Sequence, residues 1–391
     1  MREQLNKANG VVDGSLAFHW PRMRSRLLLR FSARRSLQHW ETLLDSSREI
    51  EMEKETAWLD NEHPALRKCW HPVARSEDAV EGVPLQVELL GEFWCVLRLD
   101  GQLAAFPDVC PHRLATLSEG SVVDGTLQCG YHGYRYAMDG RCVKIPAQSP
   151  SLPIPPRANC QMAAGIQDHL GLVWLAPDEP LVALPEVPEH DDPNFVNCPL
   201  EPWEWNASAA QMADNFLDLG HFPFLHLATF GVTEDEQVPD YDMERSDLSV
   251  RVEYSHATKA LADSMDNDGD FRQVERHDVF VFTPPHHVYI YIDYADENAV
   301  LAISFAHQPV NASTTRLFCT DYRNDIEDTA EARKEATLFQ LAVGAEDKAL
   351  LERSHFKAVP LDQRYEVHTK SDRVTLEMRR ILKDLVALAG E

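Results

Sequence analysis

Basic residues are scarce in this chain, which has 37 lysines and arginines against 63 aspartates and glutamates and a formal net charge of −26. Such a charge repels nucleic-acid phosphates and anionic lipids, so the composition argues against binding to either. Long apolar runs are also missing, because no stretch approaches the roughly 20 residues that a membrane-spanning helix needs. Nothing resembles the apolar core and cleavage site of a secretory signal peptide. We therefore expect a cytoplasmic protein that works without nucleic acid or membrane.

A disulfide framework is not indicated either. The eight cysteines are scattered along 391 residues, whereas disulfide scaffolds are usually short and dense in cysteine. We expect metal ligands and buried free thiols in a reducing compartment. The length predicts two domains, and no internal repeat is visible.

Residues 1–65 differ in character from the rest and are interpreted as an N-terminal extension. The stretch 23–40, "MRSRLLLRFSARRSLQHW", is rich in Arg and Ser and has no acid. It would suit a transit peptide if translation began at Met23. The alternative is an extension of little consequence, disordered or added by a start codon assigned too early, with Met52 as the working start.

An antiparallel β pattern begins at Pro84. Strand-like alternation is followed by three hairpin signals, Asp100-Gly101, Asp124-Gly125 and Asp139-Gly140. They predict a small β domain over residues 66–178. The Pro-rich, acidic stretch 177–195 is typical of a linker.

Residues 179–391 contain both helix-like and strand-like hydrophobic periodicity. The fold class predicted for the whole chain is therefore α+β. A helix is expected up to Gly220, strands within 286–323, and a long helix within 329–356. A closing helix is expected to be capped by Ser371, with an apolar face at Met378, Ile381, Leu382 and Leu385.

Two cysteines and two histidines alternate in the β domain, as Cys110, His112, Cys129 and His132. Structural zinc sites usually pair their ligands by type. Here each loop supplies one Cys and one His, which favours a [2Fe–2S] cluster with two thiolates on one iron and two imidazoles on the other. Replacing two thiolates by neutral imidazoles raises the potential of such a cluster.

The segment "CPHRLATLSEGSV…LQCGYHGYRY" resembles the Rieske motif of ring-hydroxylating and demethylating non-haem iron oxygenases. It departs from that family at Gly130, where Pro is usual, and at Tyr134, where Trp is usual. Neither residue is a ligand, but packing and potential near His132 are expected to change. The resemblance spans nearly the whole chain after about Leu66.

A second metal site is indicated by "DNFLDLGHFPFLH", residues 214–226. On an unbroken helix, five residues rotate a side chain by about 140°, so His221 and His226 would diverge. Gly220 and Pro223 predict a break that lets the second histidine swing back. Two histidines and one carboxylate form a facial triad that leaves positions open on Fe(II). Packing or capping is the other interpretation of two histidines at a helix end.

The same stretch is similar to the N-x2-D-x2-H-x4-H pattern of the oxygenase family and matches at Asn215, Asp218, His221 and His226. The resemblance assigns the iron-binding carboxylate to Asp347 in "AVGAEDKALLE", with Glu346 and Glu352 as competitors. Asn215, Asp218 and His221 are spaced by three, so they would share one helix face. Asp218 is expected to orient His221 and to accept a second hydrogen bond from a cluster histidine of a neighbouring chain.

The resemblance implies a helix-grip catalytic domain, a head-to-tail homotrimer and a separate NAD(P)H-dependent reductase of flavin or ferredoxin type. The expected activity is O2-dependent hydroxylation or O- or N-demethylation of a compact aromatic or heterocyclic substrate. Dioxygenase or desaturase chemistry, a pure electron-transfer protein and a zinc-scaffolded binding module remain as alternatives.

Three further features carry less weight. Residues 264–275 partly match a calcium-loop template but are expected to form a polar hairpin tip. His286 and His287 would either line the substrate cavity or be exposed. Trp203 and Trp205 are expected in the core.

Overall fold

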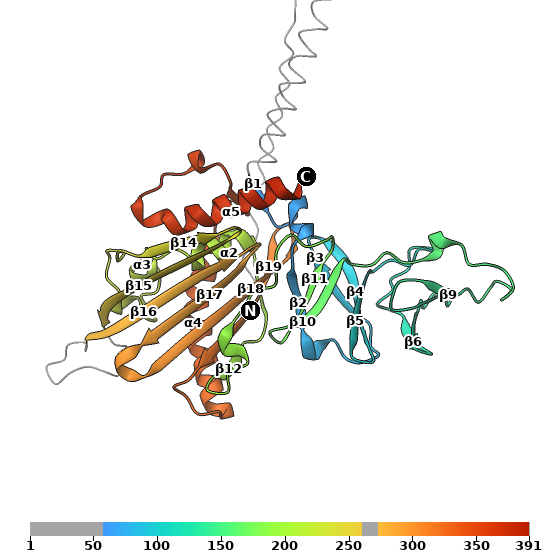
Figure 1. Ribbon diagram of the computed structural model, residues 1–391, viewed down its shortest axis with the longest axis horizontal. Helices are drawn as coiled ribbons and strands as arrows, with labels where there is room; N and C mark the ends of the chain where they lie inside the picture. Colours follow the sequence, from blue (N-terminus) through green and yellow to red (C-terminus); the bar gives the residue numbers. More distant parts are fainter. Residues whose placement is uncertain (1–57, 260–272, 391) are drawn as a thin grey trace, which may run out of the picture. The chain divides into compact units, whose positions relative to one another are not determined.

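The computed structural model describes residues 58–259 and 273–390 (Figure 1). The chain divides into two compact units, Met1–Glu53 and Lys54–Glu391, and the described residues belong to the second. The expected features of residues 1–57 and most of the calcium-like loop at 264–275 therefore lie outside the described residues. No helix among the described residues is long and apolar enough to cross a membrane.

The first half of the described chain is antiparallel β, as predicted. Its three sheets have the strand orders β10–β11–β2, β3–β4–β5 and β6–β7–β8–β9. The strands are β2 (His71–Arg75), β3 (Leu85–Leu89), β4 (Glu92–Leu99), β5 (Gln102–Pro107), β6 (Ser121–Val123), β7 (Thr126–Gln128), β8 (Arg135–Tyr136), β9 (Cys142–Lys144), β10 (Gly165–His169) and β11 (Leu172–Ala176). Asp100-Gly101 and Asp124-Gly125 have positive φ at both residues, as a tight hairpin turn requires.

The second half is built on one eight-stranded antiparallel sheet in the order β12–β19–β18–β17–β16–β15–β14, with β13 also paired to β19. Its strands are β12 (Val196–Pro199), β13 (Trp203–Trp205), β14 (Asp242–Ser246), β15 (Ser249–Lys259), β16 (Gln273–Thr283), β17 (His287–Tyr294), β18 (Ala299–Asn311) and β19 (Thr314–Arg323). The helices are α2 (Ala209–Phe216), α3 (Phe222–Leu225), α4 (Ala330–Leu351) and α5 (Arg373–Ala389). The predicted α+β class is therefore confirmed.

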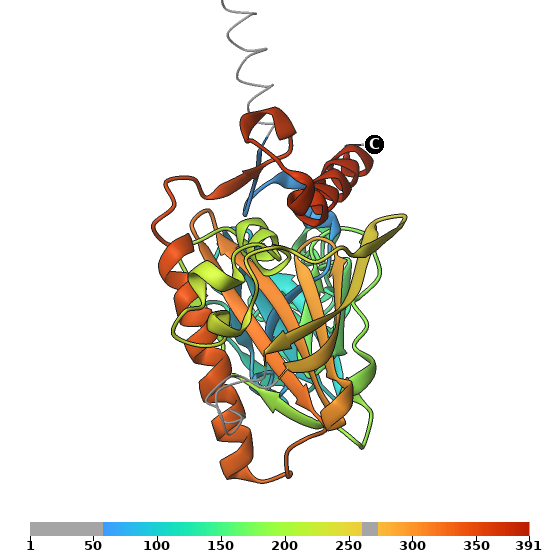
Figure 2. The ribbon, with the colours of Figure 1, turned by 90° about the vertical axis from the view of Figure 1, so that its left-hand side faces the viewer.

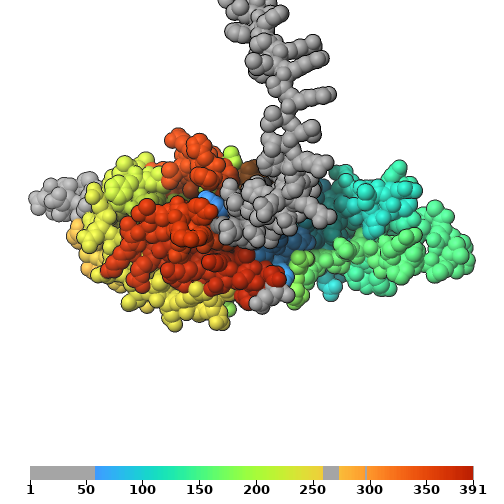
Figure 3. Space-filling model, turned by 90° about the horizontal axis from the view of Figure 1, so that it is seen from above, coloured from blue at the N-terminus to red at the C-terminus, as the bar shows by residue number. Residues whose placement is uncertain are grey.

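Helices cover this sheet. Helix α4 runs alongside the strands in Figure 2, and α2 contacts β17 and β18. Helix α5 lies against β15 and is seen in red from above in Figure 3. Its predicted apolar face is confirmed, because Met378, Ile381, Leu382 and Leu385 are fully buried. Burial of this stripe attaches the C-terminal helix to the sheet.

The fold begins before the expected boundary at residue 65. Strand β1 (Trp58–Asp60) pairs with β20 (Ala358–Pro360), and Leu59 is fully buried. Asn61 is also buried, and its Nδ2 donates to the backbone oxygen of Asn311 at 3.0 Å. Residues 58–65 therefore belong to the folded unit rather than to an extension.

Two expected helix boundaries are wrong. Helix α2 ends at Phe216 rather than at Gly220, because the Asp218 carboxylate accepts a hydrogen bond from the Gly220 N–H at 2.8 Å and closes a turn there. Helix α5 is not capped by Ser371, which lies inside a short 3₁₀ turn. The N-cap of α5 is Asp372, whose side chain instead closes a capping box with Thr369.

Candidate functional site

Two loops of the small β domain have the same backbone design. In the first, the N–H of Cys110 donates to the Ala115 oxygen at 2.8 Å, and the N–H of Leu114 returns to the Cys110 oxygen at 2.9 Å. In the second, Cys129 donates to the Tyr134 oxygen at 2.9 Å, and the N–H of Gly133 returns to Cys129 at 3.0 Å. Leu114 and Gly133 both have positive φ, which makes the tight return possible. Each loop presents one Cys and, two or three residues later, one His.

The four predicted cluster residues differ in burial, with the cysteines inside and the histidines nearer the surface. Cys110 and Cys129 are buried free cysteines, whereas His112 is partly exposed and His132 is exposed. The two imidazole rings lie 4.5 Å apart, and His112 Nδ1 is buried without a hydrogen-bond partner among the described residues. Two inner thiols and two outer imidazoles are the donor set that a Rieske cluster requires, so these residues fit the group.

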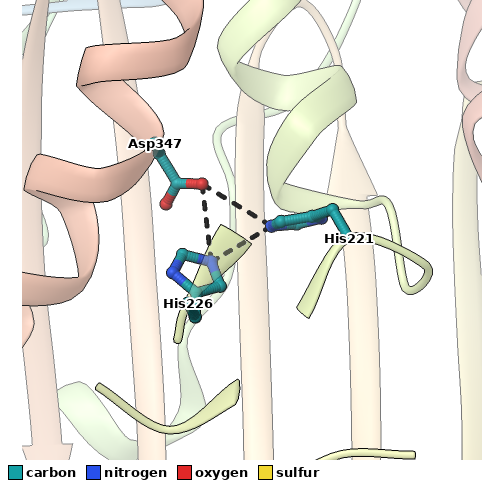
Figure 4. Close-up of side chains that lie close together, drawn as sticks. All are labelled: His221, His226 and Asp347. Carbon is teal, nitrogen blue, oxygen red and sulfur yellow. Dashed lines mark hydrogen bonds and ion pairs between the residues drawn. The ribbon is translucent and has the colours of Figure 1, made fainter. Parts of the chain in front are cut away.

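His221, His226 and Asp347 come together in the catalytic half (Figure 4). The Nε2 atoms of the two histidines lie 3.1 Å apart, and each lies 3.5 Å from Asp347 Oδ1. His226 and Asp347 are buried, and His221 is nearly so. One ligand atom from each residue falls within 4.8 Å of the others, which is the arrangement of a facial triad.

The predicted helix break produces this convergence. Helix α3 has Pro223 in its first turn, with His221 just before it and His226 just after it. Gly231 then lets its own backbone lie close to that of α3, because a Cβ at this position would lie 2.5 Å from the Phe222 oxygen. Gly344 does the same for α4, since a Cβ would lie 2.7 Å from the Trp203 ring. The close approach of α4 brings Asp347, one turn further on, to the two histidines.

The electrostatic field at this point favours a cation. Burial lowers the pKa of His221, but the carboxylates of Asp218 and Asp347 outweigh it and raise the pKa to about 9. Asp347 Oδ1 has no hydrogen-bond partner among the described residues although it is buried. A field that stabilises a proton also stabilises a metal ion, and an unpartnered buried carboxylate oxygen is a ready ligand. The three residues therefore fit mononuclear iron.

The two competing carboxylates have other partners. Glu346 contacts His226 at the opposite ring nitrogen, Nδ1, at 3.1 Å, and accepts a hydrogen bond from Thr229 Oγ1 at 2.7 Å. Glu352 accepts from the Asn206 N–H at 3.0 Å and pairs with Lys348. The carboxylate that meets the inner, Nε2, nitrogens of the two histidines is that of Asp347, which leaves Asp347 as the carboxylate in place.

Asp218 and Asn215 do not share a helix face, because Asp218 lies beyond the end of α2. Asp218 Oδ2 nevertheless lies 3.6 Å from His221 Nδ1, and its side chain is 40% exposed. Asn215 Oδ1 is buried without a hydrogen-bond partner in the described part of the chain. The structure thus brings Asp218 to the triad but records no triad contact for Asn215.

A cavity of about 360 Å³ adjoins the triad. Its wall is largely aromatic and aliphatic, and includes Phe216, Phe222, Phe230, Phe280, Ile290 and Phe305. Trp205 is fully buried in the core, as expected, whereas Trp203 is partly buried, packs against the core and also lines the cavity. The volume and lining suit a compact ring compound.

Sequence reasoning misplaced one histidine pair. His286 and His287 neither line this cavity nor reach the surface. They are buried beside His71 of β2 and His307 of β18, and the His71 and His286 rings lie 6.4 Å apart. The pairing of distant segments buries them, and no local pattern could have revealed it.

The chain matches two family models. Residues 69–162 match the Rieske [2Fe-2S] domain, and residues 205–388 match the vanillate O-demethylase oxygenase C-terminal domain. Among curated proteins, the chain is 28% identical to methylxanthine N1-demethylase NdmA of Pseudomonas putida, over 85% of this chain and 92% of the relative. It is 24% identical to a vanillate O-demethylase oxygenase subunit of Pseudomonas sp., over 83% and 96%.

Solved structures agree with this assignment. P. putida NdmA with caffeine superposes with a TM-score of 0.72 at 28% identity, covering 84% of this chain and 93% of that one. Dicamba monooxygenase bound to dicamba gives 0.68 at 21% identity, covering 83% and 98%, which supports the fold. The electron-transfer and zinc-scaffold alternatives gain no support. The chain thus combines a Rieske [2Fe-2S] domain with a vanillate O-demethylase oxygenase C-terminal domain, and its curated relatives are demethylases and oxygenases, which are oxidoreductases.

Proposed function

We propose that this protein is the terminal oxygenase of a system that removes a methyl group from oxygen or nitrogen of a compact ring substrate, or hydroxylates it. In this proposal Cys110, His112, Cys129 and His132 hold the cluster, and His221, His226 and Asp347 hold the iron. The domains correspond to about 66–178 and 179–391. The observation that carries the proposal is the apolar cavity directly beside the triad.

Iron bound by the triad would activate O2 with electrons delivered through the cluster. The chain's own residues prepare the site for this chemistry. Glu346 is within hydrogen-bond distance of the outer nitrogen of His226, and the Asp218 carboxylate lies 3.6 Å from that of His221, so both carboxylates help to direct the inner nitrogens. The aromatic wall displaces water and holds a flat ring, so that its substituent lies near the triad.

The overall reaction of a demethylation balances. One O2, two electrons and two protons convert an N-methyl or O-methyl group to its hydroxymethyl form and water. The hydroxymethyl group then loses formaldehyde, and the N–H or O–H stays on the ring. The relatives named for methylxanthine and vanillate demethylation support this outcome over dioxygenation or desaturation.

We also propose that the protein works as a head-to-tail homotrimer with an NAD(P)H-dependent reductase. None of the cavity-lining residues comes from residues 58–195, so the cluster ligands do not reach the substrate site directly. Two apolar patches support the assembly. Leu114 (76% exposed) and Tyr131 flank the cluster residues, and Phe224 (61% exposed) and Leu227 flank the iron residues. Matching one patch with the other on the next subunit gives a heterologous interface that closes as a ring. The eight free cysteines support a cytoplasmic setting.

The test is turnover with a panel of N-methyl and O-methyl ring compounds, a generic NADH-dependent reductase and ¹⁸O2. Demethylation should give formaldehyde and demethylated product in a one-to-one ratio, with one NADH oxidised for each, whereas hydroxylation should give a product that carries one ¹⁸O and no formaldehyde. An iron-loaded, cluster-containing enzyme that forms no oxygenated product with any compound would refute the proposal. Ultracentrifugation at several concentrations tests the trimer separately.

A further inference from the structure

The arginines of the cavity wall are already paired with carboxylates. Two arginines, Arg276 and Arg323, and no lysine are among the described residues that line the cavity. A substrate carboxylate would need one of them as its partner, because an anion loses its hydration when it enters an apolar cavity. The partners of these arginines therefore decide which substrates can bind.

Arg276 is held by two carboxylates. Its Nε donates to Asp278 Oδ2 at 2.9 Å, and its Nη1 donates to Glu234 Oε1 at 2.7 Å. All three side chains are more than nine-tenths buried. His256 Nε2 lies 3.6 Å from Asp278, but burial lowers the pKa of His256, so the imidazole adds no charge at neutral pH. With ionised carboxylates the group carries one net negative charge.

Arg323 is also paired, since its Nε donates to Asp325 Oδ1 at 2.8 Å. About a quarter of each of these two side chains is exposed, so water screens this pair more than the buried one. Glu297 and Asp347 also line the cavity, and Asp347 is the proposed iron ligand. Acidic residues thus outnumber basic ones in the wall.

We propose that the cavity selects ring substrates without an acidic substituent and rejects aromatic carboxylates. The inference rests on the proposed function and narrows its substrate class to uncharged rings. An entering carboxylate would meet the negative Arg276–Glu234–Asp278 group and would find both arginines of the wall already paired with carboxylates. An uncharged ring makes the same apolar contacts and leaves the buried ion pairs intact.

The matched probes are para-methoxybenzamide and para-methoxybenzoate, which differ in charge but hardly in shape. Binding to the holoenzyme is measured by calorimetry, without oxygen or reductant, so that no turnover is needed. We expect the amide to bind at least about tenfold more tightly than the acid. An acid that binds as tightly as the amide, or an amide that does not bind, would overturn the inference.

A variant tests the cause. Glu234→Gln removes one carboxylate behind Arg276 and makes the group neutral, so the acid should gain about tenfold in affinity while the amide changes by less than about threefold. Asp325→Asn frees Arg323, which is more exposed and better screened by water, so the acid should gain less affinity than in Glu234→Gln. The control is Glu244→Gln, an exposed carboxylate that does not line the cavity, which should change either affinity by less than about threefold. A folded Glu234→Gln protein with an unchanged acid-to-amide ratio would contradict the assigned cause.

If Glu234→Gln does not fold, Asp278→Asn replaces it with the same expectation. If neither variant folds, the ratio of the amide and acid affinities of the wild-type protein tests the inference. Absence of any turnover would count against the proposed function alone, because binding is measured independently of it.

Discussion

Glu346 Oε2 lies 3.1 Å from Nδ1 of His226, on the side of the ring opposite to Asp347. The same carboxylate accepts hydrogen bonds from the Ala228 N–H at 3.0 Å and from Thr229. It therefore ties α4 to the loop that follows His226. Asp218 lies further from His221, with Oδ2 at 3.6 Å from Nδ1, so each histidine of the triad has a carboxylate near its outer nitrogen but only His226 is within hydrogen-bond distance of it.

The first prediction is that Glu346→Ala weakens Fe(II) binding by about 10- to 100-fold, because His226 loses the group that fixes its ring and tautomer. Glu346→Gln keeps an acceptor oxygen and should lose less. Iron titration of the iron-depleted protein measures the affinity, and visible absorbance checks that the cluster is unchanged. Glu352→Gln, on the same helix but bonded to Asn206, is the control and should bind iron normally. Wild-type affinity in Glu346→Ala would show that the contact has no positioning role.

The cluster loops could be predicted from the sequence, because their proposed ligands lie close together along the chain and their spacing is characteristic. The choice between Glu346 and Asp347 was not readable, since neighbouring residues on a helix point about 100° apart. The packing of Gly344 on Trp203 helps to set α4 so that Asp347 meets the inner nitrogens of the two histidines and Glu346 the outer nitrogen of His226. The end of α2 was missed for a similar reason, because the Asp218–Gly220 turn competes locally with the helix.

The second prediction concerns metal content. The two proposed ligand sets imply about three irons and about two acid-labile sulfides per chain. Asp347→Asn should lower the iron content to about two while leaving sulfide and cluster absorbance unchanged. Cys110→Ser should bleach the cluster instead. Stoichiometric zinc without sulfide in the wild-type protein would contradict both assignments.

The third prediction concerns acid stability. Burial lowers the pKa of His71 and His307 to about 4 and that of His287 to about 3, and it also holds His286 well below 6.5. Between about pH 6.5 and pH 4 the unfolded chain therefore binds more protons than the native one. The free energy of unfolding should fall with falling pH, by up to about 1.4 kcal/mol per pH unit for each histidine. Above pH 6.5 these groups should have no effect.

Denaturant unfolding at several pH values measures this slope. His286→Leu should flatten it, because both ring nitrogens of His286 lack hydrogen-bond partners among the described residues and their removal loses no bond. The exposed His355→Gln is the matched control and should leave the slope unchanged. An equal slope in His286→Leu and the wild type would exclude His286 as a contributor.

The last prediction concerns Asp218, whose Oδ1 is bonded to Gly220 while Oδ2 lies 3.6 Å from His221. Its partial exposure leaves it accessible to a neighbouring subunit, where we expect His112 or His132 as its second partner. Asp218→Asn removes the charge in nearly the same shape, and Asp218→Ala removes both. Both variants should keep the cluster, and Asp218→Ala should keep most of its iron. After reduction, their clusters should fail to reoxidise when substrate and O2 are added, because the path between subunits is broken. Stopped-flow absorbance in a single turnover follows this step. If metal-replete Asp218→Ala reoxidises its cluster at the wild-type rate, Asp218 only orients His221.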